Sequence, residues 1–239
     1  MKTDLPIHQL RSLWKEAFGD TDAFLDRFFE TAFSPQRCRC ITIDGCVAAA
    51  LYWFDCRCDG KPMAYIYAVA TAKAHRGKGL CAALMADTHA HLKAAGYAGS
   101  ILVPGEKGLF AMYEKMGYAP FGGMDILSYQ AGTPIAIQEI SPAEYAELRR
   151  QYLPHQGVEQ EGMEFLATYA SLYAGVDFIF AATEETGLEL LGNAAAAPGI
   201  LAALGKKEGR FRVSGNNPFA MYRPLSDTPA PSYFGIAFD

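Results

Sequence analysis

A short basic segment with two glycines is the part of the sequence best suited to bind an anion. Residues 75–79 read His-Arg-Gly-Lys-Gly and come directly before a predicted helix at 80–95. The N–H groups in the first turn of a helix have no internal partner, and the helix dipole adds partial positive charge there. Glycines let the backbone approach a ligand closely, so this turn suits a phosphate group. A solvated basic turn without a ligand is the alternative.

The basic segment belongs to an acidic chain. The 239 residues include 21 Lys and Arg against 26 Asp and Glu, a formal net charge of −5, and no acidic residue occurs between Asp59 and Asp87. A dedicated nucleic-acid-binding protein needs an excess of Lys and Arg to neutralise phosphates. We therefore expect a small anionic ligand and no nucleic-acid partner.

Composition predicts a folded protein without a membrane span. Hydrophobic residues make up 51% of the chain and charged residues 20%, which excludes a disordered chain. No uncharged apolar run reaches the length of a membrane-spanning helix, and charges from Asp4 to Asp22 interrupt any signal-peptide core. We expect a cytoplasmic protein whose six cysteines are reduced, with monomer and homodimer both open.

Two helices and three strands are predicted before the basic segment. Apolar residues at helical spacing predict one helix at 7–18 and a second that carries an aromatic stripe from Phe24 to Phe33. Asp-Gly pairs then separate three apolar runs, and such pairs favour tight hairpin turns because both residues need positive φ. The predicted strands are 38–43, 46–58 and 61–71. The last is almost continuously apolar, as is typical of a central strand.

The elements after the basic segment complete the order ααβββαβαβ. They are the helix at 80–95, a strand at 99–103, a short helix at 108–116 and a strand from Tyr118 onward. The sequence predicts an α+β domain over residues 1–130, with a mixed, mostly antiparallel sheet flanked by helices.

The pattern restarts beyond a predicted linker at residues 131–134. Helices are predicted at 142–152, 164–173 and 198–204, and strands at 177–183, 188–191, 210–213, 219–225 and 233–238. The opening helix-helix-strand order resembles that of the first half, but no glycine-rich loop precedes the late helix. We therefore expect a smaller second α+β domain at 135–239, a degenerate copy of the first.

Two familiar phosphate-binding motifs can be compared with the basic segment. No Walker loop occurs, whereas residues 77–82 match the permissive dinucleotide fingerprint Gly-x-Gly-x-x-Ala. That fingerprint belongs in a βαβ unit, at the tight turn directly after the strand. Here several residues separate Thr71 from Gly77, and the preceding strands are joined by hairpins. A dinucleotide-dependent oxidoreductase is therefore the less favoured alternative.

The same segment resembles the pyrophosphate loop of the GNAT family, the Gcn5-related N-acetyltransferases. That loop reads Arg/Gln-x-x-Gly-x-Gly/Ala, and residues 76–81 read Arg-Gly-Lys-Gly-Leu-Cys. Residues 113–118, Tyr-Glu-Lys-Met-Gly-Tyr, resemble a second signature of the family on its late helix. The element order matches the GNAT fold as well, and the resemblance covers roughly residues 1–130.

The resemblance implies acetyl-CoA as co-substrate and gives roles to individual residues. Tyr113 would protonate the departing CoA thiolate, which suits a side chain that is neutral at pH 7. A backbone N–H near Val69 would polarise the thioester carbonyl. The residues implied in acetyl-CoA binding are Val69, Ala70, Thr71, Arg76, Gly77, Lys78, Gly79, Leu80 and Cys81.

The sequence departs from the family pattern at three places. Cys81 occupies a position where Gly or Ala is usual, and we expect a lowered thiol pKa there because a helix begins nearby. Glu106 stands where many relatives have Asn, and Tyr65 and Tyr67 replace a glutamate that serves many relatives as general base. The candidates for this base are a water chain, Asp26, Glu30, and a carboxylate from the second half, such as the C-terminal carboxylate of Asp239.

No metal site is expected. Cys38 and Cys40 form one pair and Cys56 and Cys58 another, but the hairpin arithmetic places Cys38 opposite about Leu51, so the pairs do not face each other. Metal-binding cysteines are also usually spaced more widely. His89 and His91 are two apart on a helix and do not share a face.

The resemblance to the GNAT family, together with the basic segment, implies an N-acetyltransferase that moves acetyl from acetyl-CoA to a primary amine by direct attack. The acceptor is a small molecule or a peptide, and aminoglycosides, polyamines, amino acids and protein N-termini all remain open. A non-catalytic, regulatory acyl-CoA-binding module is the principal alternative.

Overall fold

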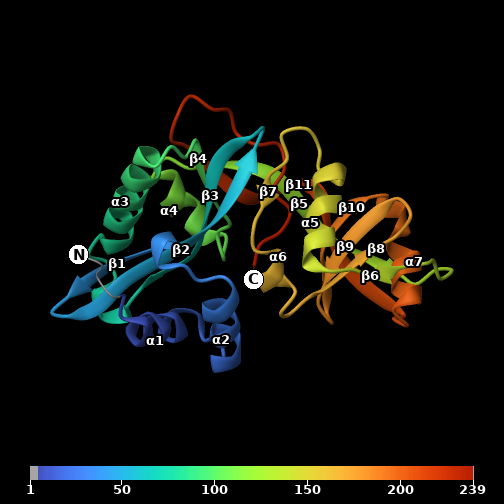
Figure 1. The fold of residues 1–239 in the computed structure, drawn as a ribbon, viewed down its shortest axis with the longest axis horizontal. Coiled ribbons are helices and arrows are strands. Elements are labelled where there is room, and N and C mark those ends of the chain that lie inside the picture. Colours follow the sequence, from blue (N-terminus) through green and yellow to red (C-terminus); the bar gives the residue numbers. More distant parts are fainter. Residues whose placement is uncertain (1–4, 239) are drawn as a thin grey trace. The chain divides into compact units, whose positions relative to one another are not determined.

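The structure, a computed structural model, describes residues 5–238 and divides the chain into two compact units. The first unit comprises Met1–Cys56, Lys61–Ala119 and Tyr222–Pro229. The second comprises Arg57–Gly60, Pro120–Met221 and Ala230–Asp239. The change from first to second unit therefore precedes the predicted linker, and the first unit includes a short segment from near the C-terminus. Figure 1 draws the chain with its helices and strands labelled.

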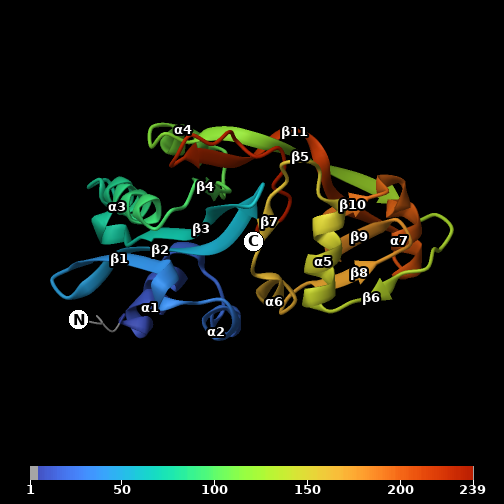
Figure 2. The same cartoon turned by 45° about the horizontal axis from the view of Figure 1, so that its top comes forward.

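Helices cover both faces of the sheet in the first unit. Helices α1 (Ile7–Phe18) and α2 (Asp22–Thr31) lie on one face, and α3 (Leu80–Ala94) and α4 (Gly108–Glu114) lie on the other (Figure 2). Gly19 ends α1 in a left-handed conformation, and the Thr21 side chain caps α2 by accepting a hydrogen bond from the N–H of Phe24. The predicted α+β arrangement of sheet and flanking helices is confirmed.

The hairpin strands of this sheet have the predicted bounds. They are β1 (Cys38–Ile43), β2 (Cys46–Cys58) and β3 (Lys61–Thr71). The register between β1 and β2 is irregular next to Ile41, so Cys38 lies opposite Tyr52 and not Leu51. Asp44 and Asp59 both have positive φ, which is the conformation that a tight Asp-Gly hairpin requires.

Strand β3 pairs with β4 over only part of its length. It is parallel to β4 (Gly99–Leu102), but the paired residues run only from Met63 to Tyr65 on β3. Ala68 follows with a φ of +49°, a left-handed value that residues with a side chain rarely adopt. Val69–Thr71 therefore lie beyond the part of β3 that pairs with β4.

The second unit contains a series of paired strands and a hydrophobic core. Its strands occur in the order β11-β10-β9-β8-β6, and β5 also pairs with β11. Their bounds are β5 (Ala119–Gln130), β6 (Gln138–Glu139), β8 (Ser171–Ala174), β9 (Phe178–Ala182), β10 (Thr186–Gly192) and β11 (Glu208–Pro224). Helix α7 (Ala197–Ala203) buries Ile200 and Leu201 against Phe180 and Phe211.

Three predictions for this half are wrong in detail. The expected helix at 164–173 is a single short turn, α6 (Met163–Leu166), followed by strand β8. The two late strands expected at 210–213 and 219–225 form one long strand, β11. Residues 233–238 make no strand, and only Tyr233 forms an isolated bridge, with Gly157. Helix α5 (Pro142–Tyr152) and the short strand β7 (Glu159–Gln160) complete the unit.

A buried ion pair connects four segments of the second unit. The Arg149 guanidinium donates to both carboxylate oxygens of Glu189, with N–O distances of 2.8 and 3.0 Å. The hydroxyls of Tyr145 and Tyr233 donate to the same carboxylate at 3.0 Å each. Gln160 accepts from Arg149 and donates to the carbonyl of Ile236. This network fastens the irregular C-terminal segment to α5 and β10.

In the described part of the chain, no helix is long and apolar enough to cross a membrane.

Candidate functional site

A cavity of about 520 Å³ in the first unit contains most of the predicted site residues. It is lined by Ala17, Phe18, Val69, Ala70, Thr71, His75, Arg76, Gly77, Gly79, Leu80, Cys81, Ala82, Leu109, Met112 and Met116. Helix α1, the end of β3, the basic loop and α4 all contribute to it. Sequence segments that are far apart are therefore brought to one place.

Two glycines shape the loop at this cavity. Gly77 and Gly79 have φ values of +73° and +77°, and Gly79 is the residue directly before α3. Residues with a side chain adopt such values at a cost, so the conformation of the loop depends on glycine at both positions. A Cβ atom added at Gly77 or Gly79 would meet no atom within 4 Å, so the backbone φ values and not crowding favour glycine there.

The basic side chains of the loop have no carboxylate partner among residues 5–238. Arg76 donates from Nε to the carbonyl of Thr71 at 3.1 Å, and Lys78 donates to the carbonyl of Ala74 at 3.1 Å. Glu16 lies nearby, but its carboxylate accepts from the backbone N–H of Lys73 at 2.5 Å. The Nδ1 atom of His75 is buried and has no hydrogen-bond partner among the described residues. Within the described residues, no carboxylate therefore neutralises Arg76 or Lys78.

Tyr113 lies beside the cavity on α4. Its side chain is only 6% exposed, and it is not part of the cavity lining. Burial, and then the nearby Cys81 thiol, raise the pKa of Tyr113 well above its ordinary value. The phenol therefore keeps its proton throughout the neutral range and can act only as an acid there.

The expectation of a lowered thiol pKa at Cys81 is wrong. Burial raises the pKa of this thiol. Loss of hydration disfavours the thiolate, and here this outweighs any favourable effect from the start of α3. Cys81 is a neutral thiol in the cavity wall, and all six cysteines are free.

The structure does not bring every predicted residue to the cavity. Lys78 and Tyr113 are absent from its lining. Neither Asp26 nor Glu30 reaches it, and the Asp26 carboxylate accepts from Arg11 at 2.6 Å. Asp239, the candidate terminal base, lies outside the described residues.

Some lining residues were not predicted as site residues. Leu109, Met112 and Met116 follow helical spacing, so the same signature that identified Tyr113 could have indicated this apolar wall. Ala17 and Phe18 belong to α1, and only the fold shows that they line this cavity. Phe18 is 47% exposed, an unusual value for a large apolar side chain at the rim of a cavity.

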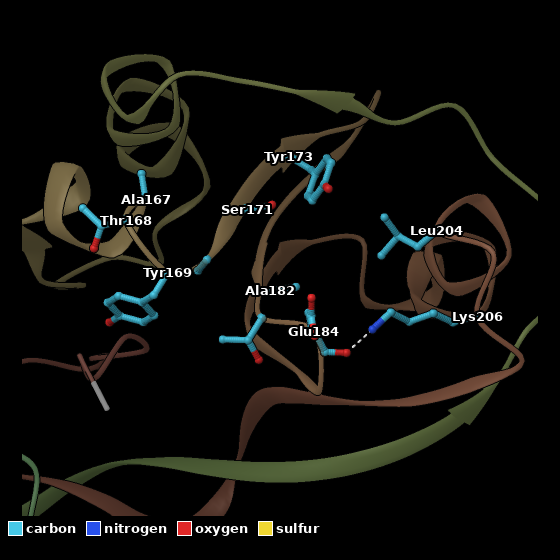
Figure 3. A pocket seen from close by; sticks show the side chains of 11 residues that line it. Ala167, Thr168, Tyr169, Ser171, Tyr173, Ala182, Glu184, Leu204 and Lys206 are labelled. Carbon is cyan, nitrogen blue, oxygen red and sulfur yellow. Dashed lines mark hydrogen bonds between the residues drawn. The ribbon is translucent and has the colours of Figure 1, made fainter. Parts of the chain in front are cut away.

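A second cavity, of about 440 Å³, belongs to the second unit. Figure 3 shows Thr168 and Tyr169 on one side of it and Leu204 and Lys206 on the other. The ammonium group of Lys206 donates to the backbone carbonyl of Glu184. None of the predicted site residues lies in this cavity. Residues 5–238 contain no group of three or more His, Cys, Asp or Glu side chains that could hold a metal ion.

Comparison with known proteins identifies the class of the first half of the chain. Residues 3–121 match the family model described as the acetyltransferase (GNAT) domain. The chain therefore belongs to the GNAT family, with the family domain in its N-terminal half. No curated protein matches the sequence.

Solved structures with a similar fold extend over both halves. A GCN5-related N-acetyltransferase from Kribbella flavida has a TM-score of 0.69 and 19% identity, over 93% of this chain and 71% of that one. Eis1 from Mycobacterium abscessus has a TM-score of 0.69 and 12% identity, over 94% and 73%. A tandem GNAT protein from the clavulanic acid biosynthesis pathway has a TM-score of 0.58 and 12% identity, over 95% and 97%. At these identities the likeness concerns the fold alone.

Proposed function

We propose that the protein transfers an acetyl group from acetyl-CoA to a primary amine. The observation that carries this proposal is the convergence of three features at one cavity. They are the basic loop before α3, the end of β3 beyond its pairing with β4, and helix α4, which lines the cavity with Leu109 and Met112 and carries Tyr113 beside it. A dinucleotide-dependent oxidoreductase gains no support from the family match.

The loop and the strand end would hold different parts of acetyl-CoA. The pyrophosphate would accept hydrogen bonds from the first N–H groups of α3, with Arg76 and Lys78 supplying positive charge. The pantetheine arm is an amide chain that can pair with Val69–Thr71 as an added strand. The apolar side chains of α4 would exclude water from the thioester.

The reaction is then a direct attack of the amine nitrogen on the thioester carbonyl carbon. The carbonyl oxygen gains negative charge, which a backbone N–H near Val69 stabilises. When the carbon–sulfur bond breaks, the CoA thiolate takes the proton of Tyr113, and the proton of the amine passes to solvent. An alkyl ammonium has a pKa of about 10.4 and must lose a proton before it attacks.

A binding comparison tests the co-substrate. We expect acetyl-CoA to raise the melting temperature of the protein and NAD(P) to leave it unchanged. The Cys81 thiol supplies an independent readout, because bound acetyl-CoA should slow its alkylation while exposed Cys46 reacts at an unchanged rate. Stabilisation by NAD(P) and not by acetyl-CoA would contradict the proposal.

A further inference from the structure

Another cavity of the first unit, of about 410 Å³, combines apolar side chains with two cations. It is lined by Ala82, Met85, Ala86, His89, Lys115, Met116, Gly117 and Arg223, and no acidic residue is among them. Ala82 and Ala86 are one helical turn apart on α3, and Lys115–Gly117 directly follow α4. The cavity therefore lies between α3 and the C-terminal end of α4.

The two cations of this cavity have no acidic partner. Arg223 donates from Nη1 to the carbonyl of Met116, and this is its one hydrogen bond within residues 5–238. A guanidinium has five N–H donors, so most of them remain for a ligand. The Lys115 ammonium has no hydrogen bond or ion pair with the described residues. The wall of the cavity thus carries two positive charges that no described carboxylate neutralises.

The position of Arg223 depends on the fold of the whole first unit. It comes from the late segment Tyr222–Pro229 and lies outside residues 3–121, which match the GNAT family model. The guanidinium packs over Gly117, where an added Cβ atom would lie 3.5 Å from Cζ of Arg223. This contact and the bond to Met116 hold the charge beside the end of α4. The family match therefore does not imply this cation.

His89 gives the cavity shape but no charge. Its side chain is 4% exposed, and Nε2 lies 2.8 Å from the hydroxyl of Tyr118. Burial, and then the nearby Arg223 cation, lower the pKa of His89 to about 4. The imidazole is therefore neutral at pH 7, and the positive charge of the cavity comes from Lys115 and Arg223.

This cavity adjoins the one proposed to hold acetyl-CoA. Ala82 and Met116 line both cavities. Met85 lies about 9 Å further along α3 than Gly79, the last residue of the basic loop. The pantetheine arm would lead from the loop to Val69–Thr71, which line only the other cavity. The nucleoside on the opposite side of the pyrophosphate is therefore the part of acetyl-CoA that can extend toward Lys115.

The nucleoside end of acetyl-CoA matches the chemistry of this cavity. It consists of a flat adenine base and a ribose with a phosphate monoester on its 3′ oxygen. Such a monoester carries about two negative charges near neutral pH, which balance the two cations. Arginine can bind two phosphate oxygens at once, and lysine adds a compact point charge. The faces of the base are suited to the exposed alanines of α3 and to Met116.

From this arrangement we infer that the cavity binds the nucleoside end of acetyl-CoA, with the 3′-phosphate held by Lys115 and Arg223. This inference rests on the proposed function, and it names the part of the co-substrate that the protein selects. Acetyl donors that lack the 3′-phosphate, such as 3′-dephospho-acetyl-CoA, are then poor ligands.

Acetyl-CoA and 3′-dephospho-acetyl-CoA form a matched pair of ligands for the test. They differ only in the phosphate monoester, so the ratio of their Kd values isolates the contacts of that group. We expect the wild type to bind acetyl-CoA about 10-fold more tightly in calorimetry at low ionic strength, because hydrogen bonds between charged groups are strong and salt screens them. Equal Kd values would overturn the inference and leave acetyl-CoA as the co-substrate.

Removing both cations should abolish this preference. In the double variant Lys115→Gln with Arg223→Gln, we expect the two Kd values to agree within about 2-fold, with that of the dephospho ligand near its wild-type value. A general distortion would weaken both ligands alike, and the unchanged ratio would contradict the inference. Arg57→Gln is the matched control, because exposed Arg57 also donates to a backbone carbonyl, that of Gly60. It should leave both Kd values unchanged.

Inorganic phosphate distinguishes a nucleoside site from a site for a free anion. The probe is added to the acetyl-CoA complex at constant ionic strength. We expect it to change the melting temperature of wild type and Arg223→Gln equally, because the 3′-phosphate already fills the site. A stabilisation of the wild-type complex that Arg223→Gln abolishes would show a separate anion there and overturn the inference. Failure of both CoA ligands to bind the wild type would instead refute the proposed function.

Discussion

Tyr113 derives its chemical state from its surroundings. Its side chain is almost fully buried, beside the Cys81 thiol, and a phenolate in that position would lose most of its hydration. A neutral phenol next to a departing thiolate is a suitable acid, whereas a phenolate would repel it. Tyr113 is thus suited to act as the general acid in the proposed reaction.

Removing the Tyr113 hydroxyl should therefore reduce kcat and leave binding largely intact. General acid catalysis contributes about 100-fold or more. We expect Tyr113→Phe to lower kcat by about this factor, with the Kd for acetyl-CoA within 2-fold of wild type, as measured by CoA release and by calorimetry. A variant with wild-type kcat would exclude Tyr113 as the acid.

The pKa of Tyr113 also predicts the alkaline side of the pH profile. Because burial raises this pKa in the folded protein, the protonated form persists above the ordinary tyrosine value of about 10. We expect no decline in kcat from pH 7 to about 10, in a buffer series that keeps ionic strength constant. A decline near pH 8 would show that another group supplies the proton.

At the scale of residues, the sequence predicted which side chains form the candidate site better than it predicted their protonation states and contacts. The loop motif and the tyrosine signature were recognisable because each depends on residues close together in the chain. The neutral thiol of Cys81 and the His89–Tyr118 contact depend on burial by distant segments, so local pattern predicted the first wrongly and did not indicate the second.

At the scale of elements, the proposed anion-binding loop depends on its two glycines. A valine at position 79 would be strained at the observed φ of +77° and would shift the first turn of α3. We expect Gly79→Val to weaken acetyl-CoA binding about 10-fold or more, which corresponds to about 1.4 kcal/mol. Calorimetric titration measures this directly.

Gly205→Val controls for the strain itself. Gly205 has a similar φ of +70° and belongs to the second unit. It should lower stability as Gly79→Val does while leaving the acetyl-CoA affinity unchanged. Equal affinity in the Gly79 variant and wild type would mean that this loop does not hold the ligand.

The predicted elements agree with the structure where turn chemistry determines them. The Asp-Gly pairs at 44–45 and 59–60 fixed the three hairpin strands to the residue. The register irregularity beside Ile41 and the positive φ of Ala68 have no such local signal. In the second unit, residues 171–173 were predicted as helix but belong to strand β8, because sheet pairing outweighs a weak helical pattern.

At the scale of the whole molecule, the second unit depends on a buried charge pair. Arg149 and Glu189 are 2% and 0% exposed, and two tyrosine hydroxyls complete the carboxylate's hydrogen bonds. Removing one member leaves the other charged and without its partner. Glu189→Ala should lower the free energy of unfolding by about 3–5 kcal/mol in urea denaturation.

Exposed Glu185, in the turn before β10, offers the matched control. Its side chain contributes no hydrogen bond in the described structure, so Glu185→Ala should leave the unfolding midpoint nearly unchanged. Similar midpoints for Glu189→Ala and Glu185→Ala would contradict the structural role given to the buried pair.

The domain organisation was predicted from element order and not from any residue-level repeat. The structure divides the chain near Ala119, and Tyr222–Pro229 belongs to the first unit although it lies late in the sequence. No local sequence pattern indicates this assignment. A degenerate GNAT origin for the second half remains a prediction.

Release of CoA from acetyl-CoA, measured with a panel of primary amines, tests the central claim most directly. The panel should span aminoglycosides, polyamines, amino acids and peptides, with mass spectrometry of the products. We expect amine-dependent CoA release, one acetyl group added to an accepted amine, and a fall of about 100-fold in the rate of both in Tyr113→Phe. Tight acetyl-CoA binding without CoA release for any amine class would contradict it and favour a non-catalytic acyl-CoA-binding module.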